Sequence, residues 1–292
     1  MLGVQSSNDP ERYLRLPNMV GKTKKEAFQN LKDRFKQRID NLSTRYLSQG
    51  GKEVFIKSIL QAIPTYSMSY FLLPKLLCSD LESIVAKFWW QKGHGGLGFR
   101  RLDQFNIALL AKQGWCLINY PNSLLAQVLK AKYFPNLDFI HAQSGNLPSL
   151  TWRSVWAAKG LLKDGLCWGV GKGDQISVWN DHWILGVTTN RRSNITENPK
   201  IESVADLIQT TCRWKKELIE NTFPEHTAQK ILQIPLVDDH EDFQVWRGEH
   251  SGEFTVRSAY KLLQEATLNP NDLLLQTEIK KFYRKLWNIQ LP

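Results

Sequence analysis

The sequence predicts a mainly α-helical protein, in which a helical bundle is followed by a small α+β segment with two β-hairpins. Between residues 23 and 135, apolar residues recur every three or four positions, the spacing that buries one side of a helix. After residue 135, short stretches suited to strands alternate with glycine-containing turns. The 292 residues are 42% hydrophobic and 23% charged, which is typical of a soluble globular protein of one or two domains.

The first helix of the bundle is expected to begin at Thr23, after 22 irregular residues. Thr23 and Glu26 have the spacing of a capping box, in which each side chain bonds the other residue's backbone N–H. Five apolar residues then follow at helical spacing: Phe28, Leu31, Phe35, Ile39 and Leu42. The sequence therefore predicts a helix of about five turns with one buried side.

Four further helices complete the predicted bundle. One covers residues 52–62 and ends before Pro64, and the next begins at a second capping box, Ser79 to Glu82, and continues to Trp90. Glycines break the chain at residues 93–98. Residues 102–119 and 123–134 form the last two helices, joined by a short connection as in helix bundles.

The second half of the chain is expected to mix short helices with strands. Thr151 caps a helix that ends at Gly165, and short helices follow at 203–209, 214–221, 224–232, 257–265 and 278–287. One hairpin pairs 166–170 with 175–179, and the second pairs 243–247 with 253–256. The predicted segments are therefore 1–22 (irregular), 23–135 (helical bundle), 136–185 (helix plus hairpin), 186–200 (linker) and 201–292 (α+β).

Eleven tryptophans are many for a chain of this length. The interpretation that we favour is that they anchor the core, and the alternative is that they form platforms on which bases stack. Four widely spaced cysteines without a Cys-x-x-Cys pair indicate free thiols in a reducing compartment rather than disulfides or a zinc site. With neither an 18-residue apolar run nor a signal peptide, the chain is expected to be soluble and intracellular.

A net charge of +10 and a pI of about 9.4 favour an anionic partner. Residues 1–60 hold twelve Lys and Arg against six Asp and Glu, so this segment supplies most of the excess. The candidate nucleic-acid-binding residues belong to the first helix, whose outer side is expected to be basic, and to its start, with two lysines nearby in sequence: Lys22, Lys24, Lys25, Lys32, Lys36, Arg38, Lys52 and Lys57. The alternative is a solvated cationic surface without a ligand, which is common on helices.

Other polar groups do not form a catalytic or metal-binding pattern. Asp238-Asp239 resembles the metal-binding aspartate pair of polymerases, but it lies in an acidic run that we interpret as a solvated loop. Gly169-Val-Gly-Lys-Gly173 resembles a phosphate-binding loop, but a predicted strand follows it, so a hairpin turn is favoured. The six histidines are scattered, and no cofactor or metal is expected.

Nine short blocks occur in one order along the chain. They are Tyr13–Pro17 (YLRLP), Leu47–Lys57 (LSQGGKEVFIK), Gln61–Ser69 (QAIPTYSMS), Phe88–Trp90 (FWW), Gly95–Arg100 (GGLGFR), Phe105–Trp115 (FNIALLAKQGW), Tyr133–Pro135 (YFP), Thr151–Ser154 (TWRS) and Trp246–Gly248 (WRG). In this order they resemble the region after the catalytic palm in plant LINE-type (non-LTR) retrotransposon reverse transcriptases. The resemblance covers nearly the whole chain.

The resemblance implies that 23–135 is a thumb and connector, a region that lies along the template–primer duplex. Residues 201–292 would lead into a zinc-binding module whose ligands are missing here. The chain would then be a fragment of an RNA-directed DNA polymerase without its palm. It would not be an enzyme by itself, and its partner would be an RNA–DNA hybrid or a duplex rather than a membrane or a small-molecule substrate.

Two departures from the family pattern indicate decay: Arg15 replaces the usual Gly, and the connector between Trp90 and Gly95 is short. The alternative function is therefore a non-enzymatic decayed remnant or a helical interaction protein without a nucleic-acid role, and a stand-alone nuclease or polymerase is not expected. The element's life cycle implies a nuclear location, and related fragments in plant mitochondrial genomes leave the mitochondrion as the alternative.

Overall fold

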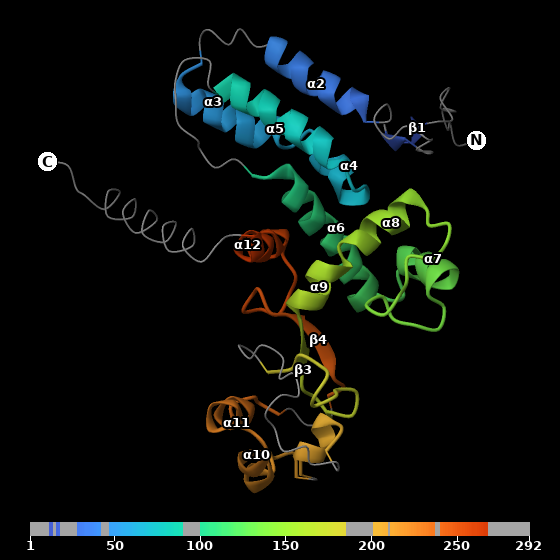
Figure 1. Ribbon diagram of the computed structural model, residues 1–292, viewed down its shortest axis with the longest axis vertical. Coiled ribbons are helices and arrows are strands. Elements are labelled where there is room, and N and C mark those ends of the chain that lie inside the picture. Colours follow the sequence, from blue (N-terminus) through green and yellow to red (C-terminus); the bar gives the residue numbers. More distant parts are fainter. Residues whose placement is uncertain are drawn as a thin grey trace, which may run out of the picture. The chain divides into compact units, whose positions relative to one another are not determined.

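The computed structural model describes residues 12–13, 16–17, 28–41, 47–89, 100–184, 201–209, 211–236 and 240–267. The protein is mainly helical with small antiparallel β elements, so the predicted class is confirmed (Figure 1). The chain divides into two compact units, one of residues 1–161 and 260–292 and the other of residues 162–259. No helix among the described residues is long and apolar enough to cross a membrane.

Helices build the first unit. Near the N-terminus, two short strands, β1 (Arg12–Tyr13) and β2 (Leu16–Pro17), pair antiparallel in the segment predicted to be irregular. The helices are α2 (Gln29–Asp40), α3 (Gln49–Phe55), the π-helical segment η2 (Ile56–Leu60), α4 (Thr65–Tyr70), α5 (Lys75–Trp89), α6 (Leu102–Asn119), α7 (Leu124–Tyr133), α8 (Leu150–Ala157), α9 (Lys159–Gly165), which ends in the second unit, and α12 (Val256–Thr267), which starts there.

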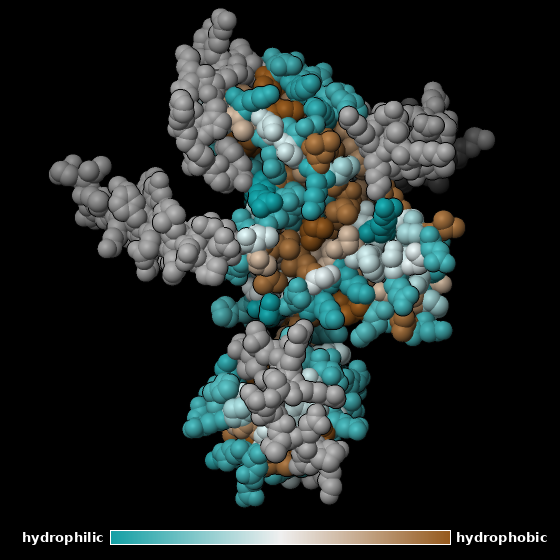
Figure 2. Space-filling model, viewed as in Figure 1, coloured by the Kyte–Doolittle hydropathy of each residue, from teal (hydrophilic) through white to brown (hydrophobic). Residues whose placement is uncertain are grey.

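Helix α6 is the centre of the first unit. It contacts α4, α5, α7 and α8, and residues on all its sides are buried, including Leu102, Leu110 and Trp115. A helix buried all round belongs to the interior of a fold, which explains why its sequence is apolar on every side. Figure 2 shows hydrophobic residues gathered on the visible face over this part of the unit.

The polar residue Asn106 joins α6 to the turn between α4 and α5. Its side-chain oxygen accepts the backbone N–H of Leu73 at 2.8 Å, and its amide donates to the carbonyl oxygens of Met68 at 2.7 Å and Phe71 at 2.9 Å. Asn106 is only 1% exposed. These three bonds satisfy backbone groups that the turn would otherwise leave buried and unpaired.

One predicted helix boundary in this unit is confirmed and another is wrong. The helix predicted at 52–62 corresponds to α3 and η2, which together span residues 49–60 and end before Pro64 as predicted; α4 is a separate helix with Pro64 as its N-cap residue. Ser79 and Glu82 do not form a capping box, because α5 begins one turn earlier. Glu82 instead accepts the backbone N–H of Leu102 at 2.6 Å and thereby caps the start of α6.

The other helix predictions of this unit agree with the structure or lie outside the described residues. Helices α6 and α7 have the predicted limits to within a residue, and Ser123 caps α7 by accepting the N–H of Ala126. Ser149 rather than Thr151 caps α8. The capping box at Thr23, the departures at Arg15 and 90–95, and the helix at 278–287 lie outside the described residues.

The second unit contains the sheet that corrects the predicted β pairing. Strand β3 (Leu166–Gly169) pairs antiparallel with β4 (Phe243–Trp246), in a register that places Leu166 opposite Trp246. Neither predicted hairpin forms: the first strand of each pairs with the first strand of the other. A 3₁₀ segment η3 (Val204–Leu207) and the helices α10 (Lys216–Thr222) and α11 (Glu225–Leu232) complete the unit near the three predicted helical positions.

The predicted segments were divided where the residue pattern changes along the chain. The two compact units are instead defined by which residues contact one another, so their limits differ. Helix α8, which the sequence assigns to 136–185, packs on α4 and α6 in the first unit. Residues 260–267 of α12 also belong to this unit, where the Tyr260 hydroxyl accepts the backbone N–H of Arg101 at 2.9 Å. The predicted linker at 186–200 lies outside the described residues, so the segment limits stay a prediction.

The core interpretation of the tryptophans is confirmed for the largest buried side chains. Trp115, Trp152 and Trp246 are among the fully buried residues of the chain. The Trp152 ring stacks on Tyr133 with 4.8 Å between ring centroids and on Phe134 with 5.3 Å. Trp246 donates from its indole nitrogen to the Ser258 hydroxyl at 2.9 Å. These rings therefore serve packing rather than base stacking.

The four cysteines are free, and two of them report on the two units separately. Burial raises the pKa of the Cys78 thiol to about 12 in the first unit, and that of Cys167 to about 11 in the second. Because the thiolate is the reactive form, we expect these thiols to react with a soluble maleimide at pH 8 at least about 100-fold more slowly than an exposed thiol. Mass spectrometry of labelled peptides measures this, and rapid labelling of Cys78 in native protein would contradict the described burial.

Candidate nucleic-acid interface

Helix α2 has one buried and one exposed side, as its sequence predicts. Phe28, Leu31 and Phe35 are buried, and Ile39 packs against the same core. Their contacts include the ring of Phe71, whose centroid lies 6.2 Å from that of Phe28. The opposite surface of α2 is hydrophilic in Figure 2. The buried stripe therefore fixes which charged residues face solvent.

The cations of α2 fall in two rows rather than on one face. Lys32 and Lys36 are four residues apart and so lie on one side of the helix, whereas Arg34 and Arg38 lie on the other side of the apolar stripe. Arg34, Lys36 and Arg38 are exposed. The outermost part of the helix, between the rows, carries Asp33, Gln37 and Asp40. The predicted basic outer side is therefore wrong in one respect: the cations flank the outermost part of the helix and do not cover it.

Lys32 is already engaged in an ion pair. Its Nζ lies 2.7 Å from Oδ2 of Asp80 on α5, and both side chains are partly exposed. The pair links α2 to α5, and a polyanion would have to compete with Asp80 for this charge. Exposed pairs of this kind contribute little stability, roughly 0–1 kcal/mol, so the competition is feasible.

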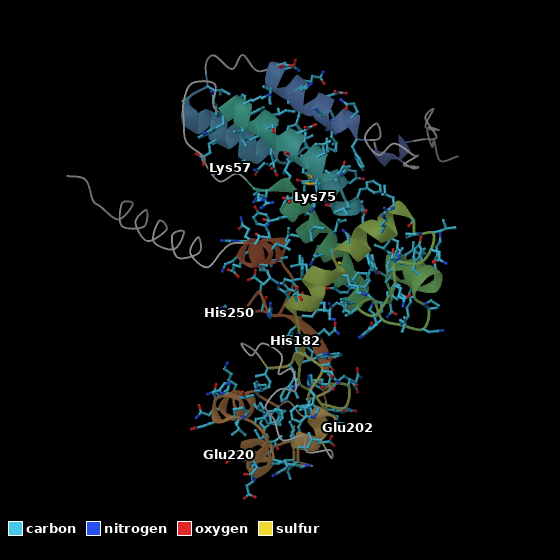
Figure 3. All side chains as sticks on the ribbon, viewed as in Figure 1. Lys57, Lys75, His182, Glu202, Glu220 and His250 are labelled. Atoms are coloured by element: carbon cyan, nitrogen blue, oxygen red, sulfur yellow. The ribbon has the colours of Figure 1, made fainter. Side chains whose placement is uncertain are left out.

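The two candidate lysines of the α3–η2 segment are also engaged. Lys52 is only 8% exposed, and its Nζ lies 5.7 Å from the centroid of the Phe88 ring, a cation–π distance. Its role in the structure is to pack α3 on α5, so it does not belong to an accessible anion-binding surface. Lys57, labelled in Figure 3, is exposed and forms an ion pair with Glu53 one turn earlier.

The structure therefore leaves Lys36 and Arg38 as the exposed candidates without an ion pair among the described residues. Lys22, Lys24 and Lys25 lie outside the described residues. Arg34, which the candidate set omitted, belongs to the surface because it shares a row with Arg38. The sequence could have shown this, because Arg34 and Arg38 are four residues apart and such residues share one side of a helix. We name Arg34, Lys36 and Arg38 the α2 cation surface.

The glycine-rich loop that resembles a phosphate-binding loop does bind an anion, namely the chain's own Asp242. One carboxylate oxygen of Asp242 accepts the N–H groups of Gly171 and Gly173, both at 2.8 Å. The other oxygen accepts the N–H of Gln175 at 3.0 Å. We name these three N–H groups with Asp242 the Asp242 cradle. The predicted hairpin turn is wrong here, because the loop folds around a carboxylate from a distant part of the sequence.

Both glycines of the Asp242 cradle are required by its geometry. Gly173 has φ of +82°, which other residues rarely adopt. A Cβ on Gly171 would lie 2.2 Å from the carbonyl oxygen of His240, which is closer than any real contact. Glycine at these two positions therefore serves a close backbone approach rather than a nucleotide phosphate.

The described residues contain no group of three or more His, Cys, Asp or Glu side chains that could hold a metal ion. Asp238, Asp239 and His94 lie outside the described residues. His182 and His250, both labelled in Figure 3, belong to separate loops of the second unit. The α2 cation surface is accordingly the strongest candidate for a functional site.

Comparison with known proteins finds relatives of the chain in Arabidopsis thaliana. One, named "Uncharacterized mitochondrial protein", is 39% identical over 147 residues, which cover 44% of this chain and 96% of the relative. Another, named "Putative ribonuclease H protein", is 26% identical over 305 residues, which cover 95% of this chain and 48% of the relative. This chain thus spans about half the length of the second relative. No family model matches.

Both relatives are consistent with a protein that derives from a plant retrotransposon. The first is matched over nearly its whole length at substantial identity. The chain therefore belongs to the same family as this mitochondrial protein of Arabidopsis thaliana.

Proposed function

We propose that this chain is the thumb and connector region of a plant LINE-type reverse transcriptase, and that it binds nucleic acid through the α2 cation surface. The ordered sequence blocks support the assignment to that region. The match to a relative named as a ribonuclease H protein supports it too, because the family often carries a ribonuclease H domain beyond this region. The ligand is an RNA–DNA hybrid or another duplex, bound without sequence preference.

The observation that carries the proposal is the exposure of three cations on one short helix. Arg34, Lys36 and Arg38 occupy two neighbouring turns of α2, whose apolar side is fixed in the core. Lys36 lies on one side of the helix and Arg34 and Arg38 on the other, so the helix can contact phosphates on both of its sides. Each phosphate that a cation neutralises releases counterions, so affinity grows with the number of such contacts.

We further propose that the chain by itself carries out no polymerase or nuclease reaction. Two-metal catalysis needs several carboxylates held around a pair of metal ions. The aspartate pair in the sequence that resembles such a site is interpreted as a solvated loop, and no palm motif is recognised in the chain. Primer extension and strand cleavage assayed with the purified chain and Mg²⁺ test this, and metal-dependent incorporation of a nucleotide would refute it.

Reversing the charge of two residues of the α2 cation surface is expected to weaken duplex binding by about tenfold or more, because two phosphate contacts become repulsive. The variant is Lys36→Glu with Arg38→Glu, and the probe is a fluorescent 20-base-pair RNA–DNA hybrid in an anisotropy titration. At fixed salt the loss should be uniform across unrelated hybrid sequences, and the salt slope should fall by about two.

A matched control has the same change in net charge on a different surface. Arg213→Glu with Lys216→Glu alters exposed cations of the second unit. This control should bind like the wild type. Equal weakening in both double variants would mean that net charge alone drives binding, and no binding by any of the proteins would favour a remnant or helical interaction protein.

We place the protein in the nucleus, where the parent element is copied. The mitochondrion is the second compartment, because one relative is named as a mitochondrial protein. Imaging of a fluorescent fusion in plant cells separates the two.

A further inference from the structure

Two exposed tyrosines form a pair on the surface of α4. Tyr66 is 44% exposed and Tyr70 is 39% exposed, although α4 otherwise packs on α6 and α8. The residues are one helical turn apart, and their rings meet edge to face with 5.5 Å between centroids and 71° between planes. Neither hydroxyl forms a hydrogen bond within the part of the chain that the structure describes.

This arrangement differs from that of the aromatic rings in the core. Phe28, Phe71 and Trp152 are buried and have their faces covered by other side chains. In an edge-to-face pair, one ring uses an edge and the other uses a single face, so ring faces remain open when both residues are exposed. The contact between the two rings also restricts their rotamers, so a ligand loses less entropy in ordering them.

The tyrosine pair is linked to the start of α2 through the neighbouring residue Phe71. Phe71 follows Tyr70 directly and contacts Phe28, the N-cap residue of α2, at 6.2 Å between ring centroids. The pair and the α2 cation surface belong to the same compact unit. Aromatic rings together with cations are the combination that binds single-stranded nucleic acid.

We infer that Tyr66 and Tyr70 form a stacking site for an unpaired base of a nucleic acid strand. The inference rests on the proposed function and deepens it: the phosphates of a duplex contact the α2 cation surface, and a single-stranded extension of that duplex stacks on the tyrosines. Stacking on an aromatic face tolerates any base, in agreement with binding that is independent of sequence.

The experiment compares two RNA–DNA hybrids, one blunt and one with a four-nucleotide single-stranded overhang, in anisotropy titrations with the full chain. The wild type should bind the overhang hybrid several-fold more tightly than the blunt one. Tyr66→Ala with Tyr70→Ala should abolish this gain and leave affinity for the blunt hybrid unchanged. Tyr66→Phe with Tyr70→Phe should retain the gain, because the stacking faces remain.

Tyr120→Ala is the matched control, since Tyr120 is an exposed tyrosine (56%) at the end of α6. It should retain the gain. The inference is overturned if the Tyr66/Tyr70 alanine variant keeps the full gain, or if Tyr120→Ala loses it equally. The inference is also overturned if the wild type binds the overhang hybrid no more tightly than the blunt one. The proposed function is tested separately, by the effect of the Lys36/Arg38 charge reversal on binding of the blunt hybrid. Circular dichroism and urea unfolding of each variant check that its overall helix content and stability match those of the wild type.

Discussion

Replacing Asp242 by Ala is expected to lower the free energy of unfolding of the second unit by about 2–4 kcal/mol. The substitution removes the acceptor of three backbone N–H groups, and two of the three, those of Gly171 and Gly173, belong to buried residues. Each buried donor left without an acceptor costs roughly 1–3 kcal/mol, and bonds to a carboxylate are stronger than neutral ones. Urea unfolding, followed by tryptophan fluorescence and by peptides of the second unit in hydrogen exchange, measures the loss.

Two further variants make the test specific to the Asp242 cradle. Asp242→Asn keeps one oxygen for the two glycine N–H groups but loses the charge and the acceptor for Gln175, so its loss should be about half as large. Asp174→Ala removes an exposed carboxylate from the same loop and should change stability by less than about 0.5 kcal/mol. A loss for Asp242→Ala no greater than that for Asp174→Ala would refute the role of the Asp242 cradle.

Replacing Asn106 by Ala is expected to destabilise the first unit by about 3–5 kcal/mol. The side chain is buried and makes three hydrogen bonds to the turn between α4 and α5, so its removal leaves one donor and two acceptors unsatisfied and also leaves a cavity. Protection of Leu73 against hydrogen exchange and the urea midpoint of the first unit should both fall.

Asn119→Ala is the control for this prediction, because Asn119 is exposed at the end of the same helix and donates only to the Trp115 carbonyl oxygen at 3.3 Å. It should cost less than about 0.5 kcal/mol. Asn106→Asp keeps an acceptor for Leu73 but turns one carboxylate oxygen toward two carbonyl oxygens, so it should be no more stable than the alanine variant. An Asn106→Asp variant as stable as the wild type would contradict the described bonding.

The longer helices of the first unit were predictable from local sequence. The limits of α6 follow from a long, mainly apolar stretch without proline, and the apolar periodicity of α2 placed its cations correctly off the core. The failures occur where a partner distant in sequence decides the local structure. Ser79 and Glu82 have the spacing of a helix start, but Glu82 caps a different helix.

The β pairing was not predictable from local signals. The glycines after β3 resemble a hairpin turn, and only the position of Asp242 in space shows that they surround a carboxylate. Likewise, the sequence around Lys52 does not show that its ammonium lies over Phe88, 36 positions away. Periodicity therefore predicts which side of a helix or strand is buried. Which distant residue that side contacts is known only from the three-dimensional structure.

The salt dependence of hybrid binding by the wild-type chain tests the central claim most directly. Four cations of α2, with Lys32 released from Asp80, predict that log Kd rises linearly with log salt concentration with a slope of about 3 to 4, since each phosphate contact on a duplex contributes about 0.9. Measurements between about 50 and 200 mM salt cover the range in which this slope is well defined. A slope near 4 that falls by about two in the Lys36/Arg38 charge-reversal variant is the predicted result. A slope near zero, or one that the variant leaves unchanged, would contradict nucleic-acid binding by this helix.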